Sequence, residues 1–160
     1  MIKIIIVILF IFNSLACEPI QQASDRENIQ RDNSFVCLTS QSQCGINTKF
    51  GRFNIQFSGE ALQQSIKTEL PFQVQLTLNA ANEAYQLKSI SSYLEGKTMF
   101  MGKIPIFFQI NKTNSMVAES LLASCSEEGM TWRLWFQIEI LADGKIHQQD
   151  FFIDFDSQRL

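Results

Sequence analysis

The chain has 160 residues, a formal net charge of −3 and 46% hydrophobic residues, and it contains fourteen phenylalanines. No stripe of Lys and Arg is visible, so we expect no nucleic-acid partner, because phosphate binding needs several clustered basic side chains. The length suits one domain with a real hydrophobic core and excludes two domains of ordinary size.

The first sixteen residues have the three parts of a bacterial secretion signal. Lys3 supplies the basic start, an unbroken apolar run extends from Ile4 to Phe12, and small residues precede a cysteine. The run is shorter than the roughly 20 residues that cross a hydrocarbon core, so a permanent membrane helix is the weaker interpretation. We therefore predict that residues 1–16 are a signal peptide and that the chain is exported.

Cys17 is the predicted site of lipid attachment. Leu15-Ala16-Cys17 resembles the end of a lipoprotein signal, and a diacylated or triacylated cysteine would anchor the chain stably in a membrane. The alternative is ordinary cleavage, after which Cys17 would enter a disulfide. Glu18 follows the cysteine and, by resemblance to enteric bacterial sorting, favours the outer membrane. The expected location is the bacterial periplasm, with the protein attached to a membrane.

Residues 17–35 are predicted to be the lipidated cysteine and a flexible polar tether. The stretch is rich in Gln, Asn and Asp and shows no sustained apolar period. A folded domain is expected over residues 36–160, where the pattern of hydrophobic residues changes.

Alternation of apolar and polar residues then predicts a series of short β-strands. A strand is expected from Lys49 to Phe57, and another begins directly after Pro71. Asp143-Gly144 suits a tight hairpin turn between the last two strands. The remaining predicted strands cover residues 86–94, 104–110, 116–122, 131–141 and 145–155, and a short helix is considered for residues 59–68.

This pattern predicts an all-β fold, an immunoglobulin-like β-sandwich of about seven antiparallel strands. A small barrel is the alternative, because it would bury the same phenylalanine faces.

Three cysteines remain if Cys17 carries lipid: Cys37, Cys44 and Cys125. An odd number in an oxidising compartment leaves one thiol unpaired or shared between proteins. Cys37 and Cys44 are the disulfide candidates because they are close in sequence, although either could instead pair with Cys125.

No catalytic motif is visible, and we do not expect an enzyme. His147 is the only histidine, and no serine or cysteine partner for it is indicated by a motif. Carboxylates such as Asp154 and Asp156 are expected to be solvated surface charges.

The sulfur-containing residues form the one pattern that suggests a site. Met99 and Met101 would point to the same side of an extended chain, and Cys125, Met116 or Met130 could complete a set of soft ligands. Thioether and thiolate ligands select Cu(I) over harder ions. The alternative is that these methionines simply fill gaps in the core.

The order of these features resembles the YtkA-like and FixH-like periplasmic domains. The similarity is closest to small uncharacterised proteobacterial proteins found with cytochrome oxidase copper-insertion factors. It is carried by Leu94-Glu95-Gly96, Met99-Phe100-Met101-Gly102, Cys125, and Gly129-Met130-Thr131-Trp132, over roughly residues 37–141. The resemblance implies an immunoglobulin-like sandwich with Met99 and Met101 at one sheet edge, near Cys125 and Met130.

Two functional hypotheses follow. The first is a membrane-anchored periplasmic lipoprotein that binds Cu(I) at Met99, Met101, Cys125 and Met130 and assists copper delivery or assembly of a respiratory oxidase. The second is a non-catalytic lipoprotein of the cell envelope that holds a protein partner on a sheet face and binds no metal.

Overall fold

The computed structural model describes residues 34–59, 62, 65–124 and 126–160. All of them belong to one compact unit, residues 31–160. The predicted signal peptide, Cys17, the tether up to residue 33, and Cys125 lie outside the described residues. No helix in the described part of the chain is long and apolar enough to cross a membrane.

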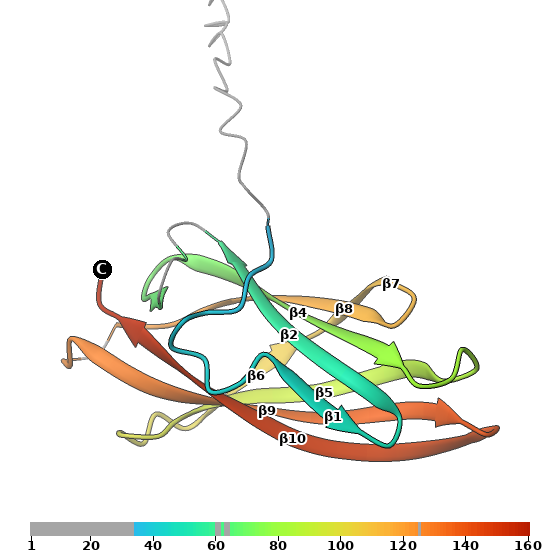
Figure 1. Ribbon diagram of the computed structural model, residues 1–160. Helices are drawn as coiled ribbons and strands as arrows, with labels where there is room; N and C mark the ends of the chain where they lie inside the picture. The colour runs from blue at the N-terminus through green and yellow to red at the C-terminus, as the bar shows by residue number, and fades with distance from the viewer. Residues whose placement is uncertain (1–33, 60–61, 63–64, 125) are drawn as a thin grey trace, which may run out of the picture. The chain divides into compact units, whose positions relative to one another are not determined.

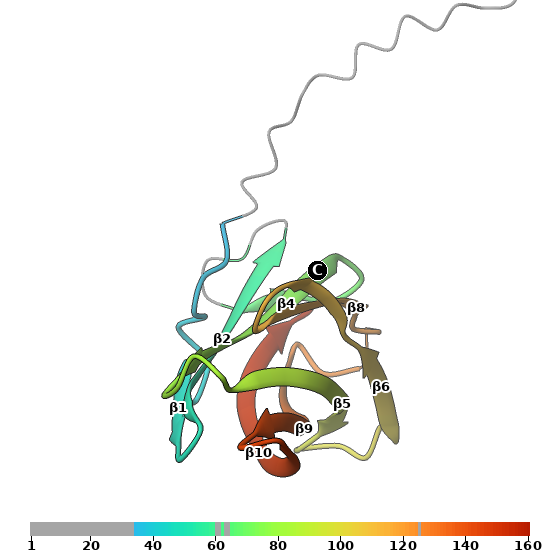
Figure 2. The ribbon, with the colours of Figure 1, turned by 90° about the vertical axis from the view of Figure 1, so that its right-hand side faces the viewer.

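Within the described residues, ten strands form two five-stranded sheets that face each other (Figures 1 and 2). The first sheet has the order β1-β2-β4-β8-β7. Its strands are Gly45–Thr48 (β1), Gly51–Gly59 (β2), Pro71–Ala80 (β4), Ser115–Leu121 (β8) and Gln109–Lys112 (β7).

The second sheet has the order β3-β10-β9-β5-β6. Its strands are Ile66–Lys67 (β3), Lys145–Gln158 (β10), Gly129–Ala142 (β9), Gln86–Gly96 (β5) and Lys103–Phe107 (β6). All neighbouring strands in both sheets are antiparallel except β3 and β10, which pair in parallel over two residues.

The connectivity is that of an immunoglobulin-like sandwich. Strands β2, β4, β8 and β7 occupy the A, B, E and D positions, and β5, β9 and β10 occupy the C, F and G positions. The predicted all-β sandwich is confirmed, and the barrel alternative is wrong because the strands form two separate sheets.

The sandwich contains more strands than the expected seven. The stretch predicted as one strand, 104–110, divides at Phe108 because β6 and β7 belong to different sheets. The short helix considered for residues 59–68 is wrong: Gly59 ends β2, and Ile66 and Lys67 form β3. Residues 60, 61, 63 and 64 of that stretch lie outside the described residues.

The core lies between the sheets and is lined by aromatic side chains. Phe53, Phe57, Phe136 and Phe155 are fully buried, and so is the larger indole of Trp132. The indole Nε1 of Trp132 donates a hydrogen bond of 2.9 Å to the buried Ser157 Oγ. The hairpin from β9 to β10 turns at Asp143 and Gly144, which have the positive φ angles of 53° and 73° that the sequence pattern predicts.

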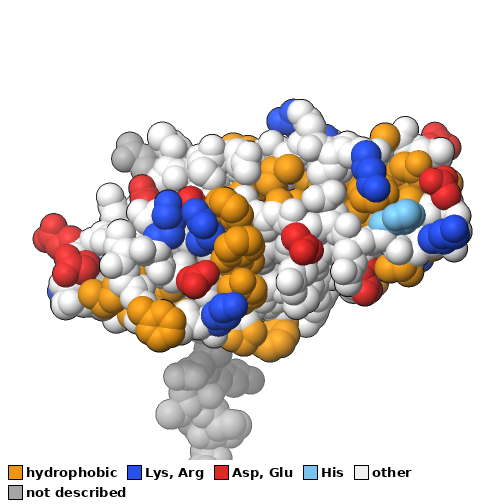
Figure 3. All heavy atoms as spheres, turned by 90° about the horizontal axis from the view of Figure 1, so that it is seen from below, with side chains coloured by type: hydrophobic (Ala, Val, Ile, Leu, Met, Phe, Trp, Pro, Cys, Tyr) orange, Lys and Arg blue, Asp and Glu red, His pale blue; other side chains and the backbone are white. Residues whose placement is uncertain are grey.

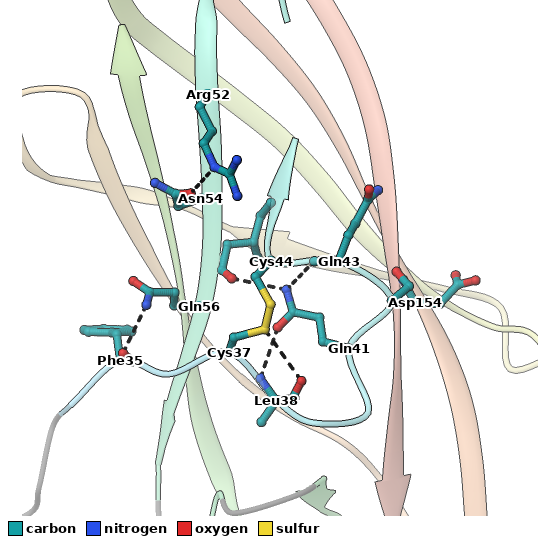
Figure 4. The surroundings of a disulfide bond; sticks show 12 residues. Phe35, Cys37, Leu38, Gln41, Gln43, Cys44, Arg52, Asn54, Gln56 and Asp154 are labelled. Carbon is teal, nitrogen blue, oxygen red and sulfur yellow. Dashed lines mark hydrogen bonds between the residues drawn. A yellow bond between two sulfur atoms is a disulfide. The ribbon is translucent and has the colours of Figure 1, made fainter. Parts of the chain in front are cut away.

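A disulfide joins Cys37 to Cys44, which confirms one of the expected pairings and excludes a bond from either cysteine to Cys125 (Figure 4). The residues between and including these cysteines, 37–44, are called the strap below. The buried Gln41 fixes the shape of the strap, because its Nε2 donates to the carbonyl oxygens of Gln43 at 2.7 Å and Ile55 at 3.1 Å. Just before the strap, Val36 forms an isolated bridge with Phe57 of β2.

The strap also hydrogen-bonds to β10 of the other sheet. The Ser42 amide donates to the Asp154 carbonyl at 2.7 Å, and the Asp154 amide donates to Ser42 Oγ at 2.9 Å. Ser40 Oγ accepts a hydrogen bond from the Asp156 amide. The strap therefore connects the two sheets and covers part of the edge of β10.

Candidate functional site

The predicted methionine ligands lie at the end of β5 and the start of β9. Met99 and Met101 belong to the loop between β5 and β6, and Met130 is the second residue of β9. The loop is held against β9 because the Lys97 amide donates a hydrogen bond of 2.9 Å to the Thr131 carbonyl. We call Gly96, Met99, Met101 and Met130 the methionine end.

Gly96 is the point at which these residues converge. A Cβ at this position would overlap the Met99 carbonyl oxygen and would lie 3.2 Å from Met130 Cε and 3.4 Å from Met101 Cγ. The Met101 side chain from the loop, the Met130 side chain from β9 and the backbone of Met99 thus surround the space above Gly96. A larger residue than glycine would displace the loop or both side chains.

The methionines differ in exposure. Met99 is 37% exposed, Met101 is partly buried against the core, and Met130 is 4% exposed. Met116 is 3% exposed and belongs to β8 of the first sheet, where it faces Leu76 and Ile110 in register. The structure therefore brings Met101 and Met130 together with the backbone of Met99 and places Met116 in the core on β8.

No group of three or more His, Cys, Asp or Glu side chains that could hold a metal ion is found among residues 34–59, 62, 65–124 and 126–160. His147, the only histidine, lies against the Phe50 ring, with 5.3 Å between the ring centroids. The side chains of Met99, Met101 and Met130 in the methionine end carry thioethers, which are soft donors.

A second feature lies on the outer face of the second sheet, next to the methionine end. Phe152 of β10, Trp135 of β9 and Tyr93 of β5 are direct cross-strand neighbours and form what we call the aromatic row. The ring centroids are 4.9 Å apart for Phe152 and Trp135 and 6.1 Å apart for Trp135 and Tyr93. In Figure 3, hydrophobic side chains form a band across this face, with basic and acidic side chains beside it.

Cations cover both ends of the aromatic row. The Lys103 ammonium lies 4.4 Å from the Tyr93 ring centroid, and the Arg133 guanidinium lies 3.8 Å from that of Phe152. Trp135 Nε1 donates a hydrogen bond of 3.0 Å to Glu95 Oε2. These contacts fix the orientation of the rings, and cation–π pairs of this kind add to the stability of the sheet.

Asp154 holds the adjacent basic side chains. Its carboxylate accepts hydrogen bonds from Arg133 Nε at 2.8 Å and Arg133 Nη2 at 3.1 Å, and from Lys97 Nζ at 2.9 Å. Hydrogen bonding from Arg133, supported by Lys97, lowers the pKa of Asp154 below its ordinary value, although partial burial opposes the shift. Asp154 is therefore not the solvated charge expected from the sequence. It also links the strap to Lys97 at the start of the methionine loop.

The aromatic row was only partly visible in the sequence. Alternation in β9 places Trp135 on the other face of the strand from the buried Trp132 and Leu134. The outward position of Trp135 could therefore be predicted from the sequence. Tyr93 and Phe152 become its neighbours only through the pairing of β9 with β5 and β10.

The sequence matches no family model, and a search of curated proteins gives no match. Among solved structures, the fold is similar to that of a DUF4785 family protein from Legionella pneumophila subsp. pneumophila str. Philadelphia 1, with a TM-score of 0.53 and 16% sequence identity. The similarity covers 70% of this chain but only 30% of the Legionella chain. At this identity the similarity supports the fold alone.

Proposed function

We propose that the protein is a membrane-anchored periplasmic lipoprotein that binds Cu(I) at the methionine end and assists copper delivery or the assembly of a respiratory oxidase. The observation that supports this proposal is the convergence of Met101 and Met130 above Gly96, beside the exposed Met99. Cys125, in the connection that leads to Met130, is the proposed thiolate ligand and lies outside the described residues. Membership of the YtkA-like and FixH-like group is part of the same proposal.

The donors in this region suit a soft ion. Thioethers bind Cu(I) without competition from protons, and their flexible side chains adapt to a low coordination number. When bound, Cu(I) would supply the cargo for transfer to a partner. The chain's own contribution would be to hold the thioethers in place through Gly96 and through the hydrogen bond between Lys97 and Thr131.

The copper proposal predicts that Met99 and Met101 both contribute to affinity. Protein that starts at residue 17 and carries Cys17→Ser should bind Cu(I) with a sub-micromolar dissociation constant when titrated against a competing chelator. The double substitution Met99→Leu and Met101→Leu should weaken binding at least about tenfold, or ~1.4 kcal/mol. Leucine keeps the volume and hydrophobicity of methionine but removes the thioether.

Met116→Leu is the matched control because it makes the same chemical change at the buried methionine on β8, and it should leave Cu(I) affinity unchanged. The copper proposal fails if the parent protein shows no sub-micromolar binding, or if the double variant binds as the parent does.

The anchor is proposed on Cys17, in a membrane facing the periplasm, with the outer membrane favoured. The Cys37–Cys44 disulfide supports export, since stable disulfides persist in oxidising compartments and are rare in the cytoplasm. Cells that express the full chain should incorporate labelled palmitate into it, and globomycin should cause the unprocessed form to accumulate. Cys17→Ser is the control and should abolish labelling; an unlabelled parent protein would contradict the anchor.

The second candidate is a protein-binding or scaffolding lipoprotein that binds no metal. It is supported by exposed apolar side chains along one segment: Phe100 is 88%, Phe107 is 76% and Ile110 is 74% exposed. They lie in the loop before β6, at the end of β6 and in β7, and strands at sheet edges offer unpaired backbone groups to partners. The copper titration separates the candidates, because this one predicts no high-affinity binding.

A further inference from the structure

The outer face of the second sheet carries a pattern of charge that is complementary to itself. Beside the aromatic row, in the direction of the methionine end, four residues are aligned across the strands: Asp154 on β10, Arg133 on β9, Glu95 on β5 and Lys103 on β6. We call them the charged row. From β10 to β6 their charges are negative, positive, negative and positive. Residues at equal distances on either side of the midpoint between β9 and β5 therefore carry opposite charges.

This arrangement of charges means that a half-turn matches each member of the charged row with an opposite charge. Lys97, which hydrogen-bonds to Asp154 at 2.9 Å, lies beside the row and is not part of this match. A two-fold axis parallel to the strands, between β9 and β5, would place Asp154 of one copy opposite Lys103 of the other. The same rotation would place Arg133 opposite Glu95. Each contact would occur twice, as in any isologous two-fold interface.

The aromatic row fits the same axis. Pro105 of β6 continues this row because it is paired with Tyr93. The half-turn would bring Trp135 opposite Tyr93 and Phe152 opposite Pro105. On the other side of the aromatic row, Gln137 and Ser91 are neighbours in register and would face each other as hydrogen-bonding partners. Tyr, Trp and Arg are also the residues that supply most binding energy in protein interfaces.

The face is large enough for a stable dimer. Eleven residues of each of β10, β9 and β5, together with the five residues of β6, cover about 600 Å² at a strand spacing of about 4.8 Å. Specific interfaces bury about 600 to 1,000 Å² on each partner, so the face reaches the lower end of this range. Arg133 is already hydrogen-bonded to Asp154, and Trp135 to Glu95, so these four side chains have little freedom left to lose on association.

We propose that a second copy of this chain docks on the outer face of the β3-β10-β9-β5-β6 sheet, around a two-fold axis that runs parallel to the strands between β9 and β5. The inference concerns a different surface from the methionine end and does not depend on copper binding. In this dimer the aromatic row lies at the centre of the interface. The charged row favours this one arrangement of the two copies because it pairs opposite charges.

Sedimentation equilibrium on the chain from residue 17 tests the dimer. The protein should carry Cys17→Ser and Cys125→Ser, so that no disulfide between copies can form. A reversible equilibrium between monomer and dimer is expected, because the face has the area of a specific interface. Lys103→Glu should weaken the dimer at least about tenfold, because the new carboxylate would face Asp154 of the other copy at two places. The matched control is Lys112→Glu, because Lys112 is an exposed lysine on β7 of the first sheet. This substitution should leave the dimer unchanged.

A mixing experiment tests the position of the axis. Asp154→Lys should also weaken its own dimer, because the new ammonium would face Lys103. Mixed with the Lys103→Glu variant, it should form a heterodimer at least about tenfold tighter than either variant alone, since opposite charges then meet at both places. A monomeric parent protein would overturn the proposal, and so would two folded variants whose mixture stays monomeric. Thermal melts of each variant establish folding.

Discussion

Loss of the Cys37–Cys44 disulfide is expected to lower the free energy of unfolding by about 2.5 kcal/mol, the entropy that closing a loop of about eight residues removes from the unfolded chain. The loss should be at least this large, because the strap also hydrogen-bonds to β2 and β10. Without the disulfide, the closed loop no longer holds these hydrogen-bonding groups in position. The double substitution Cys37→Ser and Cys44→Ser should be compared with the parent by urea unfolding. The midpoint should fall with little change in slope.

Ser42→Ala is the control for the strap's hydrogen bonds, because it keeps the disulfide and removes the hydroxyl that accepts from the Asp154 amide. It should lower the free energy of unfolding by about 1 kcal/mol. Equal stability of the parent and the double serine variant would contradict the structural role given to the strap.

Replacing Trp132 should have the largest effect on stability. Its indole is fully buried between the sheets, and its Nε1 is the hydrogen-bond donor to Ser157 Oγ, which is itself buried. Trp132→Ala should lower the free energy of unfolding by about 3–5 kcal/mol, because it leaves a large cavity and an unsatisfied hydroxyl. Thermal or urea unfolding measures the loss of stability. A variant that no longer folds would also agree with the predicted destabilisation.

Trp132→Phe keeps the protein testable if the alanine variant does not fold, and it should cost less because most of the ring volume remains. Trp135→Ala is the matched control, since the same residue type lies on the outer face of the same strand and leaves no enclosed cavity. An equal loss of stability at Trp132 and Trp135 would show that the division of β9 into core and outer faces is wrong.

The fold was predictable because its signal is local. Alternation within each strand placed Phe53, Ile55, Trp132 and Leu134 on the buried side without any knowledge of the neighbouring strands. The turn at Asp143-Gly144 was predictable for the same reason, since two adjacent residues define it. The helix considered for residues 59–68 failed because Ile66 and Lys67 pair with the distant β10, and short-range pattern does not report such pairing.

The candidate sites were less predictable because they depend on pairing between distant segments. The spacing of Met99 and Met101 suggested a half-site, but the meeting of Met101 with Met130 requires β5 and β9 to be neighbours. The charged row contains residues from four strands, and no short stretch of sequence reveals its order. The disulfide illustrates the same limit, since Cys37 and Cys44 were candidates but their pairing became definite only in three dimensions.

The strap also affects how the chain behaves before the Cys37–Cys44 disulfide has formed. Strand β10 is fourteen residues long, and its outer edge is shielded near its C-terminal half by the strap and by β3. A chain whose cysteines are still reduced would hold this shield less firmly and would offer an extended row of backbone donors and acceptors to other chains, which is the usual starting point of aggregation. Formation of the Cys37–Cys44 disulfide would thus secure the cover over this sheet edge.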